Sequence, residues 1–227
     1  MSLFHLRDPG EPCPAKLPVL LANRGVFGLE KTVMFDLFDT QLIPGLSAQD
    51  GFCTPDNEAF LVEQIEAQAL APFRFQGWFG KRLTASFGFN YDFETAAFAP
   101  AEPIPAWLEP IRAQAAAFAG LKAGDLVQAL LLCYDPGAGI GWHRDRPLFE
   151  HVIGISLGAD TSMRFRRRTE KGFQRLSLPI LSRSIYHLSG EARYQWEHSI
   201  ADMSEKRWSI TFRSLSARGR DFLSRGN

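Results

Sequence analysis

The sequence Tyr134-Asp-Pro-Gly-Ala-Gly-Ile-Gly-Trp-His-Arg-Asp145 joins a glycine-rich turn to a histidine and an aspartate that stand two residues apart. If the chain is extended after Gly141, neighbouring side chains point to opposite faces, so His143 and Asp145 share one face. An imidazole and a carboxylate on one face suit a first-row divalent metal. A second histidine would complete the 2-His-1-carboxylate triad that is typical of non-haem iron(II) sites. The rest of the chain must therefore supply a third ligand.

The glycines of this segment do not fit a nucleotide-binding loop. Such a loop is followed directly by a helix whose N-terminus faces the phosphate. Here Asp135-Pro136-Gly137 leads into Trp-His-Arg-Asp-Arg-Pro, which is a poor helix. We therefore predict a tight turn followed by the strand that carries the two ligands.

The composition is that of a globular protein with a large apolar core. The chain has 227 residues, of which 45% are hydrophobic and 12% aromatic, and this length fits one large domain. Its 25 basic and 25 acidic residues cancel, so bulk charge does not favour polyanion binding, although a local basic patch is compatible with this balance. Three cysteines without metal-site spacing indicate a reducing compartment. Because we find neither an apolar signal segment nor a membrane-spanning run, we expect a cytoplasmic protein.

Two helices are predicted in the first half of the chain, after an irregular proline-rich arm at 1–30 and a strand at 33–38. Thr54-Pro55-Asp56 combines a hydroxyl cap, a proline and an acid, as helix N-termini do. The first helix would bury a stripe at fourfold spacing, Leu61, Ile65 and Ala69. The second would follow the proline-rich connector 99–105, end near Gly120, and bury Leu108, Ile111, Ala115 and Phe118.

The second half of the chain has the pattern of an antiparallel β-protein. Short runs rich in Val, Ile, Leu and Phe alternate with turn residues, which favours a sandwich or jelly-roll. The expected strands are 126–134, 151–157, 163–166, 174–180, 184–188, 193–197 and 207–215. We therefore predict a mainly β fold with flanking helices (α+β), built on a double-stranded β-helix (jelly-roll, cupin-like) barrel.

The third metal ligand is not determined by spacing alone. His198 and His187 both lie in the β-rich half, and a neighbouring strand could carry either of them to His143 and Asp145. Residue order does not choose between these two histidines.

The heptad Arg207-Trp-Ser-Ile-Thr-Phe-Arg213 would, as a strand, place two arginines and two hydroxyls on one face. An edge strand with its polar side in water explains this pattern on its own. The alternative is a strand that faces the barrel lumen. A buried unpaired arginine costs several kcal/mol, so the lumen would need an anionic ligand. A small dicarboxylate would suit two guanidinium groups, which bind carboxylates through two parallel hydrogen bonds.

Five motifs follow one another in the second half of the chain: Tyr134-x-Pro-Gly, His143-x-Asp145, Ser156-Leu-Gly158, Ser189-Gly-Glu-Ala-Arg-Tyr-Gln-Trp-x-His198 and Arg207-x-Ser-x-Thr-Phe-Arg213. In this order they resemble the AlkB family of iron(II) and 2-oxoglutarate-dependent dioxygenases. A weaker similarity to the same family lies in Phe87-Gly-Phe-Asn-Tyr-Asp-Phe93.

The resemblance implies Fe(II), 2-oxoglutarate and O2, with His143, Asp145 and His198 as the metal ligands. It also implies that Arg207, assisted by Tyr134, binds the distal carboxylate of 2-oxoglutarate, while Arg213 lies near the metal-chelating end. The remaining pocket residues would be Leu130, Ile140, Ser209 and Thr211. Within a single domain, 1–227, residues 1–50 would form an N-terminal arm and strands, 51–120 helices and substrate-lid strands, and 121–227 the jelly-roll core.

The implied activity is oxidative demethylation of alkylated single-stranded DNA or RNA, as in DNA repair, with release of formaldehyde, succinate and CO2. Aromatic residues interleaved with cations in 73–93 can stack bases and contact phosphates, although strands that bury an aromatic face explain that segment better. The expected substrate residues are Lys81, Arg82, Phe87, Phe89, Tyr91 and Arg146. The alternatives are a protein side chain or small molecule as substrate, and a non-catalytic cupin-like metal-binding module. A monomer without membrane contact is favoured.

Two positions depart from the nucleic-acid members of that family. Leu132 replaces an asparagine two residues before Tyr134, which removes one polar contact to the cosubstrate. Pro147 replaces an acid that helps to read the methylated base, and a base-specific pocket depends on such polar partners. Apart from these motifs, Arg164-Phe-Arg-Arg-Arg168 with Lys171 and Arg175 forms a dense basic cluster at an expected hairpin. This cluster is either a phosphate contact or a solvated turn.

Overall fold

The computed structural model describes residues 43–75, 78–91 and 97–225, which all belong to one compact unit, Thr32–Asn227. The predicted arm at 1–30 and the predicted strand at 33–38 lie outside the described residues. Among the described residues, no helix is long and apolar enough to cross a bilayer.

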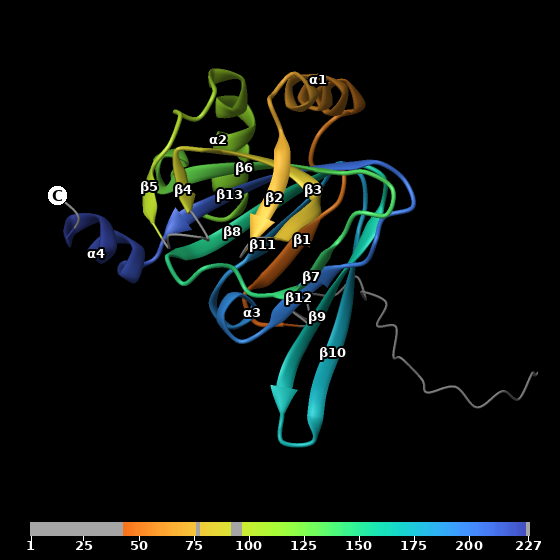
Figure 1. Cartoon of the computed structure of the whole chain (residues 1–227), viewed down its shortest axis with the longest axis vertical. Coiled ribbons are helices and arrows are strands. Elements are labelled where there is room, and N and C mark those ends of the chain that lie inside the picture. Colours follow the sequence, from red (N-terminus) through yellow and green to blue (C-terminus); the bar gives the residue numbers. More distant parts are fainter. Residues whose placement is uncertain (1–42, 76–77, 92–96, 226–227) are drawn as a thin grey trace, which may run out of the picture. The chain divides into compact units, whose positions relative to one another are not determined.

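Strands make up the largest share of the described structure (Figure 1). The larger sheet contains β1 (Leu46–Gln49), β2 (Ala71–Phe75), β3 (Trp78–Phe87), β6 (Leu126–Tyr134), β8 (Phe149–Gly158), β11 (Ser184–Leu188) and β13 (Arg207–Leu215). The smaller sheet contains β7 (Ile140–His143), β9 (Thr161–Thr169), β10 (Gly172–Ile180) and β12 (Glu197–Ile200), and a separate pair is formed by β4 (Phe89–Tyr91) and β5 (Phe98–Pro100).

The strand order confirms the predicted jelly-roll. The larger sheet runs β1-β11-β8-β13-β6-β3-β2 and the smaller β10-β9-β12-β7, so strands distant in sequence are neighbours in space. All the pairings are antiparallel. The barrel is larger than the predicted core at 121–227, because β1, β2 and β3 extend the larger sheet. The expected substrate-lid role of the segment 51–120 stays a prediction.

One predicted strand is wrong. Residues 193–196 do not form a strand, because the helix α3 (Gly190–Tyr194) covers the start of this range and β12 begins only at Glu197. Ala192 and Arg193, which are neighbours in α3, are both buried, whereas neighbouring side chains of a strand point to opposite faces.

The helices α1 (Pro55–Glu66) and α2 (Glu109–Phe118) occur where the sequence predicts them. The Oγ1 atom of Thr54 accepts a hydrogen bond from the backbone N–H of Asn57 at 3.2 Å, as expected for an N-cap. Leu61 and Ile65 are buried as predicted, but Ala69 is exposed because it lies beyond the end of the helix. Three shorter helical segments are η1 (Ala106–Leu108), η2 (Ala123–Asp125) and α4 (Ala217–Arg225).

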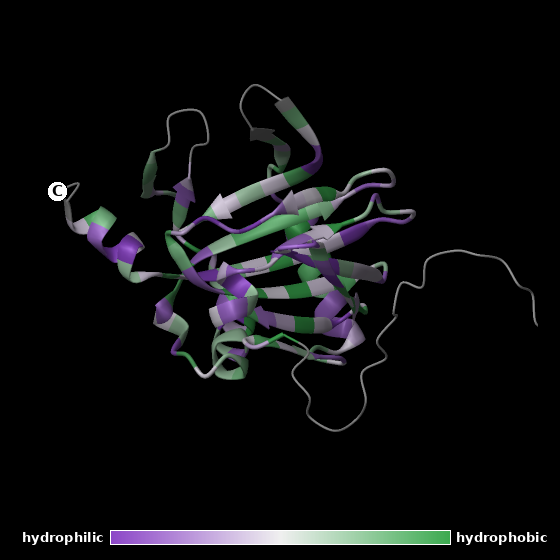
Figure 2. Cartoon of the chain, turned by 90° about the horizontal axis from the view of Figure 1, so that it is seen from below, coloured by the Kyte–Doolittle hydropathy of each residue, from purple (hydrophilic) through white to green (hydrophobic). Residues whose placement is uncertain are grey.

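Both α1 and α2 pack on the outer face of the larger sheet, where their apolar residues join one core cluster with Ile153, Ile155, Ile210 and Phe212. Figure 2 shows the resulting alternation of hydrophobic and hydrophilic residues along the strands. On the opposite face of β13, away from α1 and α2, the side chains of Arg207, Ser209, Thr211 and Arg213 line a cavity between the two sheets. Because β13 pairs with both β6 and β8, the edge-strand explanation of this heptad is wrong and the lumen explanation is right.

Candidate active site

The turn before β7 positions the first ligand. The backbone N–H of Ala138 donates to the carbonyl of Asp135 at 2.9 Å, and Gly137 adopts a φ of +82°, which favours glycine. At Gly139 a Cβ atom would lie 2.9 Å from the Ile200 carbonyl oxygen, so the missing side chain lets the segment approach β12 closely. The turn therefore leads into β7 in the register that places His143 opposite His198.

Two histidines and one aspartate meet at this point. The potential ligand atoms of His143, Asp145 and His198 all lie within 4.8 Å of one another. The Nε2 atom of His198 is 3.5 Å from Oδ2 of Asp145, and the two imidazole ring centres are 4.3 Å apart. The Nδ1 atom of His143 is 2.9 Å from the Gly141 carbonyl. Since that carbonyl only accepts, Nδ1 carries the proton and Nε2 presents its lone pair.

Arg213 holds the aspartate ionised. Its Nε and Nη2 atoms lie 2.9 Å and 2.8 Å from Oδ1 of Asp145, and its Nη1 donates to Oε1 of Gln128 at 3.0 Å. Burial alone would raise the pKa of Asp145, but Arg213, and then His198 and His143, hold that pKa below its ordinary value. Burial and the neighbouring His143 lower the pKa of His198 to about 3, and burial also lowers the pKa of His143. An ionised carboxylate and two neutral imidazoles are the forms in which these groups bind a metal.

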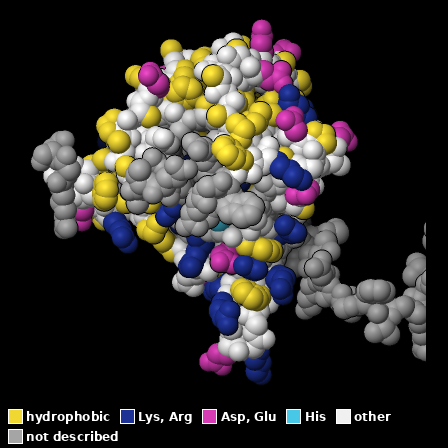
Figure 3. Space-filling view, in the orientation of Figure 1, with side chains coloured by type: hydrophobic (Ala, Val, Ile, Leu, Met, Phe, Trp, Pro, Cys, Tyr) yellow, Lys and Arg dark blue, Asp and Glu magenta, His cyan; other side chains and the backbone are white. Residues whose placement is uncertain are grey.

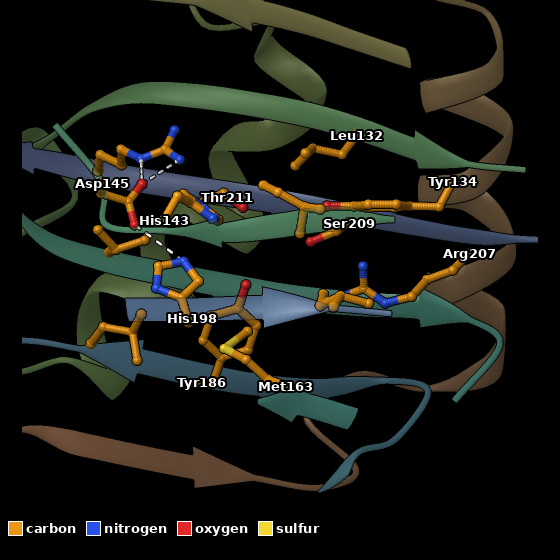
Figure 4. A pocket seen from close by; sticks show the side chains of 15 residues that line it. Leu132, Tyr134, His143, Asp145, Met163, Tyr186, His198, Arg207, Ser209 and Thr211 are labelled. Carbon is orange, nitrogen blue, oxygen red and sulfur yellow. Dashed lines mark hydrogen bonds and ion pairs between the residues drawn. The ribbon is translucent and has the colours of Figure 1, made fainter. Parts of the chain in front are cut away.

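Arg207 marks the other end of the cavity (Figure 4), away from Asp145 and His198. Its side chain is 1% exposed, its Nε donates to Oγ of Ser156 at 3.0 Å, and its Cζ lies 5.2 Å from the centre of the Tyr134 ring. The two terminal nitrogens, Nη1 and Nη2, are buried and have no hydrogen-bond partner among the described residues. Buried donors are normally satisfied, and a guanidinium with two free terminal N–H groups fits a carboxylate. The structure therefore has room for an anion that reaches from Arg207 toward the three potential ligands.

A model of the 2OG-Fe(II) oxygenase superfamily matches residues 63–215, which is more than half of the chain. The chain belongs to the 2OG-Fe(II) oxygenase superfamily. As a member it is a dioxygenase that depends on Fe(II), 2-oxoglutarate and O2, and the predicted AlkB relationship is confirmed by its relatives.

Over 179 residues the oxygenase is 28% identical to the tRNA (carboxymethyluridine(34)-5-O)-methyltransferase alkbh8 of Xenopus tropicalis, a match that covers 76% of this chain and 27% of that protein. Over 195 residues it is 29% identical to the alkylated DNA repair protein ALKBH8 homolog of Arabidopsis thaliana, covering 74% of this chain and 54% of that protein. The chain thus spans about a quarter to a half of the length of these relatives. The solved structure of OsALKBH1 has the same fold, with a TM-score of 0.59 and 14% identity over 77% of this chain and 99% of that chain.

Four of the predicted cosubstrate residues, Tyr134, Ile140, Ser209 and Thr211, line the cavity of this oxygenase together with Arg207 and Arg213. Leu130 does not line it: the side chain is on the same face of β6 but packs in the neighbouring cluster around Leu132 and Tyr134. Leu132, which we had noted only as a departure from the family pattern, lines the cavity instead.

Tyr186 is a lining residue that sequence reasoning missed. It lies on β11 with its ring against Gly154, where a Cβ atom would be 2.1 Å from Cζ of the tyrosine. Burial raises the pKa of Tyr186 to about 12, so its hydroxyl stays protonated at neutral pH and can donate a hydrogen bond into the cavity. The strand prediction for 184–188 implied two faces, but it held no signal for which face is the lumen.

His187, the rival third ligand, points away from the cavity because it neighbours Tyr186 on the same strand. Its Nε2 atom is 2.9 Å from Nδ1 of His151, and the two rings stack with centres 5.1 Å apart. The geometry therefore agrees with the choice of His198 that the family resemblance implied.

Two of the predicted substrate residues make packing contacts within the fold. Phe87 packs against the apolar cluster under α1 and α2, and Phe89 stacks on Phe98 with ring centres 5.2 Å apart. Both rings belong to the packing of the fold, as the strand explanation of this aromatic segment anticipated.

Of the other four predicted substrate residues, Lys81 is exposed, whereas Arg82, Tyr91 and Arg146 are half-buried. Lys81 is exposed and its Nζ donates to the Gly137 carbonyl at 3.1 Å, so it lies over the turn that precedes β7. The guanidinium of Arg82 lies 3.9 Å from the centre of the Phe73 ring. Arg146 directly follows Asp145, and its guanidinium lies 4.2 Å from the centre of the Tyr91 ring. A substrate role for these four residues remains a prediction.

Proposed function

We propose that this oxygenase is an AlkB-type oxidative demethylase that removes N-alkyl lesions or methyl marks from single-stranded DNA or RNA. The cavity carries the oxygenase part of the proposal, because the triad at one end faces the unsatisfied guanidinium of Arg207 at the other. The nucleic-acid part is supported by the relatives, whose names refer to a tRNA methyltransferase and to the repair of alkylated DNA.

In this proposal His143, Asp145 and His198 hold Fe(II). Two neutral imidazoles and one ionised carboxylate are the donor set of the 2-His-1-carboxylate sites, which leave coordination positions open for the cosubstrate and O2. When bound, the metal and 2-oxoglutarate would supply the oxidising chemistry together with O2, of which one oxygen atom enters succinate as CO2 is released and the other hydroxylates an N-methyl carbon. The resulting hydroxymethyl group leaves as formaldehyde.

The protein's own residues bind the cosubstrate and orient the metal ligands. Arg207 would pair with the distal carboxylate of 2-oxoglutarate through its two free terminal N–H groups, with Tyr134 beside it and the hydroxyls of Ser209 and Thr211 along the wall. Arg213 fixes Asp145 through Oδ1, so that carboxylate keeps its Oδ2 atom on the side of His198. Apolar side chains such as Ile140 and Met163 line the rest of the cavity and exclude water.

A second candidate is the same oxygenase chemistry on a protein side chain or a small molecule. The observation that favours it is Pro147, which is exposed and offers no side-chain group for a nucleobase, while its carbonyl is already occupied by Oγ of Ser216 at 2.7 Å. The alternative of a silent cupin-like module, which would keep the metal geometry without turnover, disagrees with the match to the 2OG-Fe(II) oxygenase family.

Two assays separate these candidates. With Fe(II), 2-oxoglutarate and O2, even uncoupled turnover should form succinate, and this should vanish in His143→Ala; binding of both ligands without any consumption of 2-oxoglutarate would leave only the silent module. Formaldehyde release should then be compared for methylated single-stranded DNA, methylated RNA and methylated histone-like peptides. Release from peptides alone would reject the nucleic-acid substrate.

A further inference from the structure

The outer face of the smaller sheet carries a row of arginines that the proposed chemistry does not use. Along β9, the inward side chains Met163 and Phe165 are buried, so the alternate residues Arg164, Arg166 and Arg168 face outward. On the paired strand β10, Arg175 lies opposite Arg166 and Phe173 lies opposite Arg168. We call these five residues, together with Trp142 on β7, the arginine face.

Aromatic rings order the arginines of this face. The guanidinium carbon of Arg166 lies 4.5 Å from the centre of the Trp142 ring and 4.7 Å from that of Phe173. Arg164 lies 5.3 Å from the centre of the Trp142 ring, while Arg168 and Arg175 lie 5.8 Å and 5.5 Å from that of Phe173. Such cation–π contacts hold the planar guanidinium groups in place, so less side-chain entropy is lost when they bind a ligand.

The arginine face keeps most of its positive charge. Arg166 pairs with Glu197 at 2.6 Å. Among the described residues, Arg164, Arg168 and Arg175 have no carboxylate within ion-pair distance. The opposite face of the same hairpin differs, because Arg167 there is bound to Glu191 at 2.6 Å. Figure 3 shows Lys and Arg side chains gathered over this hairpin and its base.

The arginine face adjoins the candidate active site through a groove. Arg164 and Lys81 both line this groove. Phe79 also lines it, and its side chain is 65% exposed. Asp202 is the acid that lines it. Ile140 and Ile200 line the groove and also the metal-bearing cavity, so the two share a wall. A polymer that follows the arginine face therefore passes beside the strand that carries His143.

We propose that the arginine face and the adjoining groove bind the phosphate backbone of a single-stranded nucleic acid and present it to the cavity. Successive outward arginines of β9 stand ~7 Å apart along the strand, which gives a regular row of cations for a polyphosphate chain. Arginine binds phosphate through two parallel hydrogen bonds, and aromatic rings beside such a cationic track stack with unpaired bases. This proposal specifies how the substrate strand is held and rests on the proposed nucleic-acid function.

The binding test uses the full chain, fluorescently labelled unmethylated single-stranded DNA and RNA, and the double variant Arg168→Gln/Arg175→Gln. Both residues are exposed and lie outside the cavity. Each single-strand phosphate contact adds ~0.7 to the slope of log K against log salt, so the variant should lower that slope by ~1.4 and raise the dissociation constant ~25-fold at about 0.1 M salt. The control is Lys122→Gln/Arg218→Gln, which removes the same charge from exposed positions elsewhere and should leave the slope unchanged.

Equal weakening by the two double variants, or no weakening by either, would overturn the proposal. The proposal would also be overturned if the Arg168→Gln/Arg175→Gln variant lost affinity for polyglutamate but not for the oligonucleotides, because the arginine face would then bind acidic protein partners. Phe173→Leu keeps the charge but removes the ring, and it should weaken oligonucleotide binding by a few-fold.

Turnover assays separate failure of this surface from failure of the proposed function. The Arg168→Gln/Arg175→Gln variant should form succinate without substrate at the wild-type rate. With a methylated oligonucleotide it should show a raised KM and an unchanged kcat. Formaldehyde release with an unchanged KM would reject the surface alone, whereas the absence of release in every protein would reject the demethylase while leaving the binding result intact.

Discussion

Replacing Arg207 with alanine removes the buried guanidinium at the end of the cavity, and we expect the affinity for 2-oxoglutarate to fall about a hundredfold. The two terminal nitrogens of Arg207 have no partner among the described residues, so both would be available to one carboxylate. A hydrogen bond to a charged group contributes ~1.5–3 kcal/mol, and the pair therefore contributes at least ~3 kcal/mol. Each ~1.4 kcal/mol is a factor of ten in the dissociation constant, which gives the hundredfold estimate.

The assay is thermal unfolding with and without 2-oxoglutarate, in the presence of Fe(II) and without O2. At a concentration ~100 times the wild-type dissociation constant, the cosubstrate stabilises the protein by ~2.7 kcal/mol, and after a hundredfold loss of affinity by only ~0.4 kcal/mol. Fe(II) binding should persist, because Arg207 does not touch His143, Asp145 or His198. Arg168→Ala removes an exposed arginine outside the cavity and should behave as the wild type. A parallel loss of metal and cosubstrate affinity, or a change of less than a few-fold in the latter, would refute the assigned role.

Four further substitutions test other parts of the structure. His143→Ala should abolish Fe(II) binding and succinate formation, whereas His187→Ala should retain both; metal loss in the second variant would contradict the ligand assignment. Gly154→Ala should lower stability by ~1–3 kcal/mol and weaken 2-oxoglutarate binding, because the new methyl group pushes the Tyr186 ring into the cavity; unchanged binding by calorimetry would contradict this geometry. Glu58→Gln should lower the free energy of unfolding at pH 7, since hydrogen bonds outweigh burial and hold the pKa of Glu58 below its ordinary value. That contribution is present above the unfolded pKa and lost as pH falls through the folded pKa, so urea titrations should show the difference shrinking below pH ~4.3.

Alternation within a strand was enough to predict which side chains of β13 share a face. Arg207 and Arg213 had to share a face, and a cavity rather than solvent on that face follows once β13 is paired on both sides. That pairing joins strands from distant parts of the sequence, which no local pattern contains. The same limit applies to His198, whose place depends on the register between β12 and β7.

The errors have local physical causes. The strand predicted at 193–197 failed because its first residues belong to α3, which ends at Tyr194, and the strand starts only at Glu197. Phe87 and Phe89 make packing contacts, as aromatic side chains in strands mostly do, and their expected substrate role stays a prediction. Leu130 lies on the same face of β6 as Leu132 and Tyr134 and opposite Thr211, but it is not among the residues that line the cavity. In contrast, the basic cluster at 164–175 was recognised as a hairpin, and only the pairing of β9 with β10 and the position of Trp142 showed that its arginines form one face.

The most direct test of the central claim is the ratio of formaldehyde to succinate during turnover of a methylated single-stranded oligonucleotide. Each demethylation consumes one 2-oxoglutarate, so coupled turnover should yield the two products in a ratio near one, with succinate formation faster than in the absence of the strand. Succinate formed at the same rate with and without DNA or RNA, with no formaldehyde above the His143→Ala background, would contradict nucleic-acid demethylation by this protein.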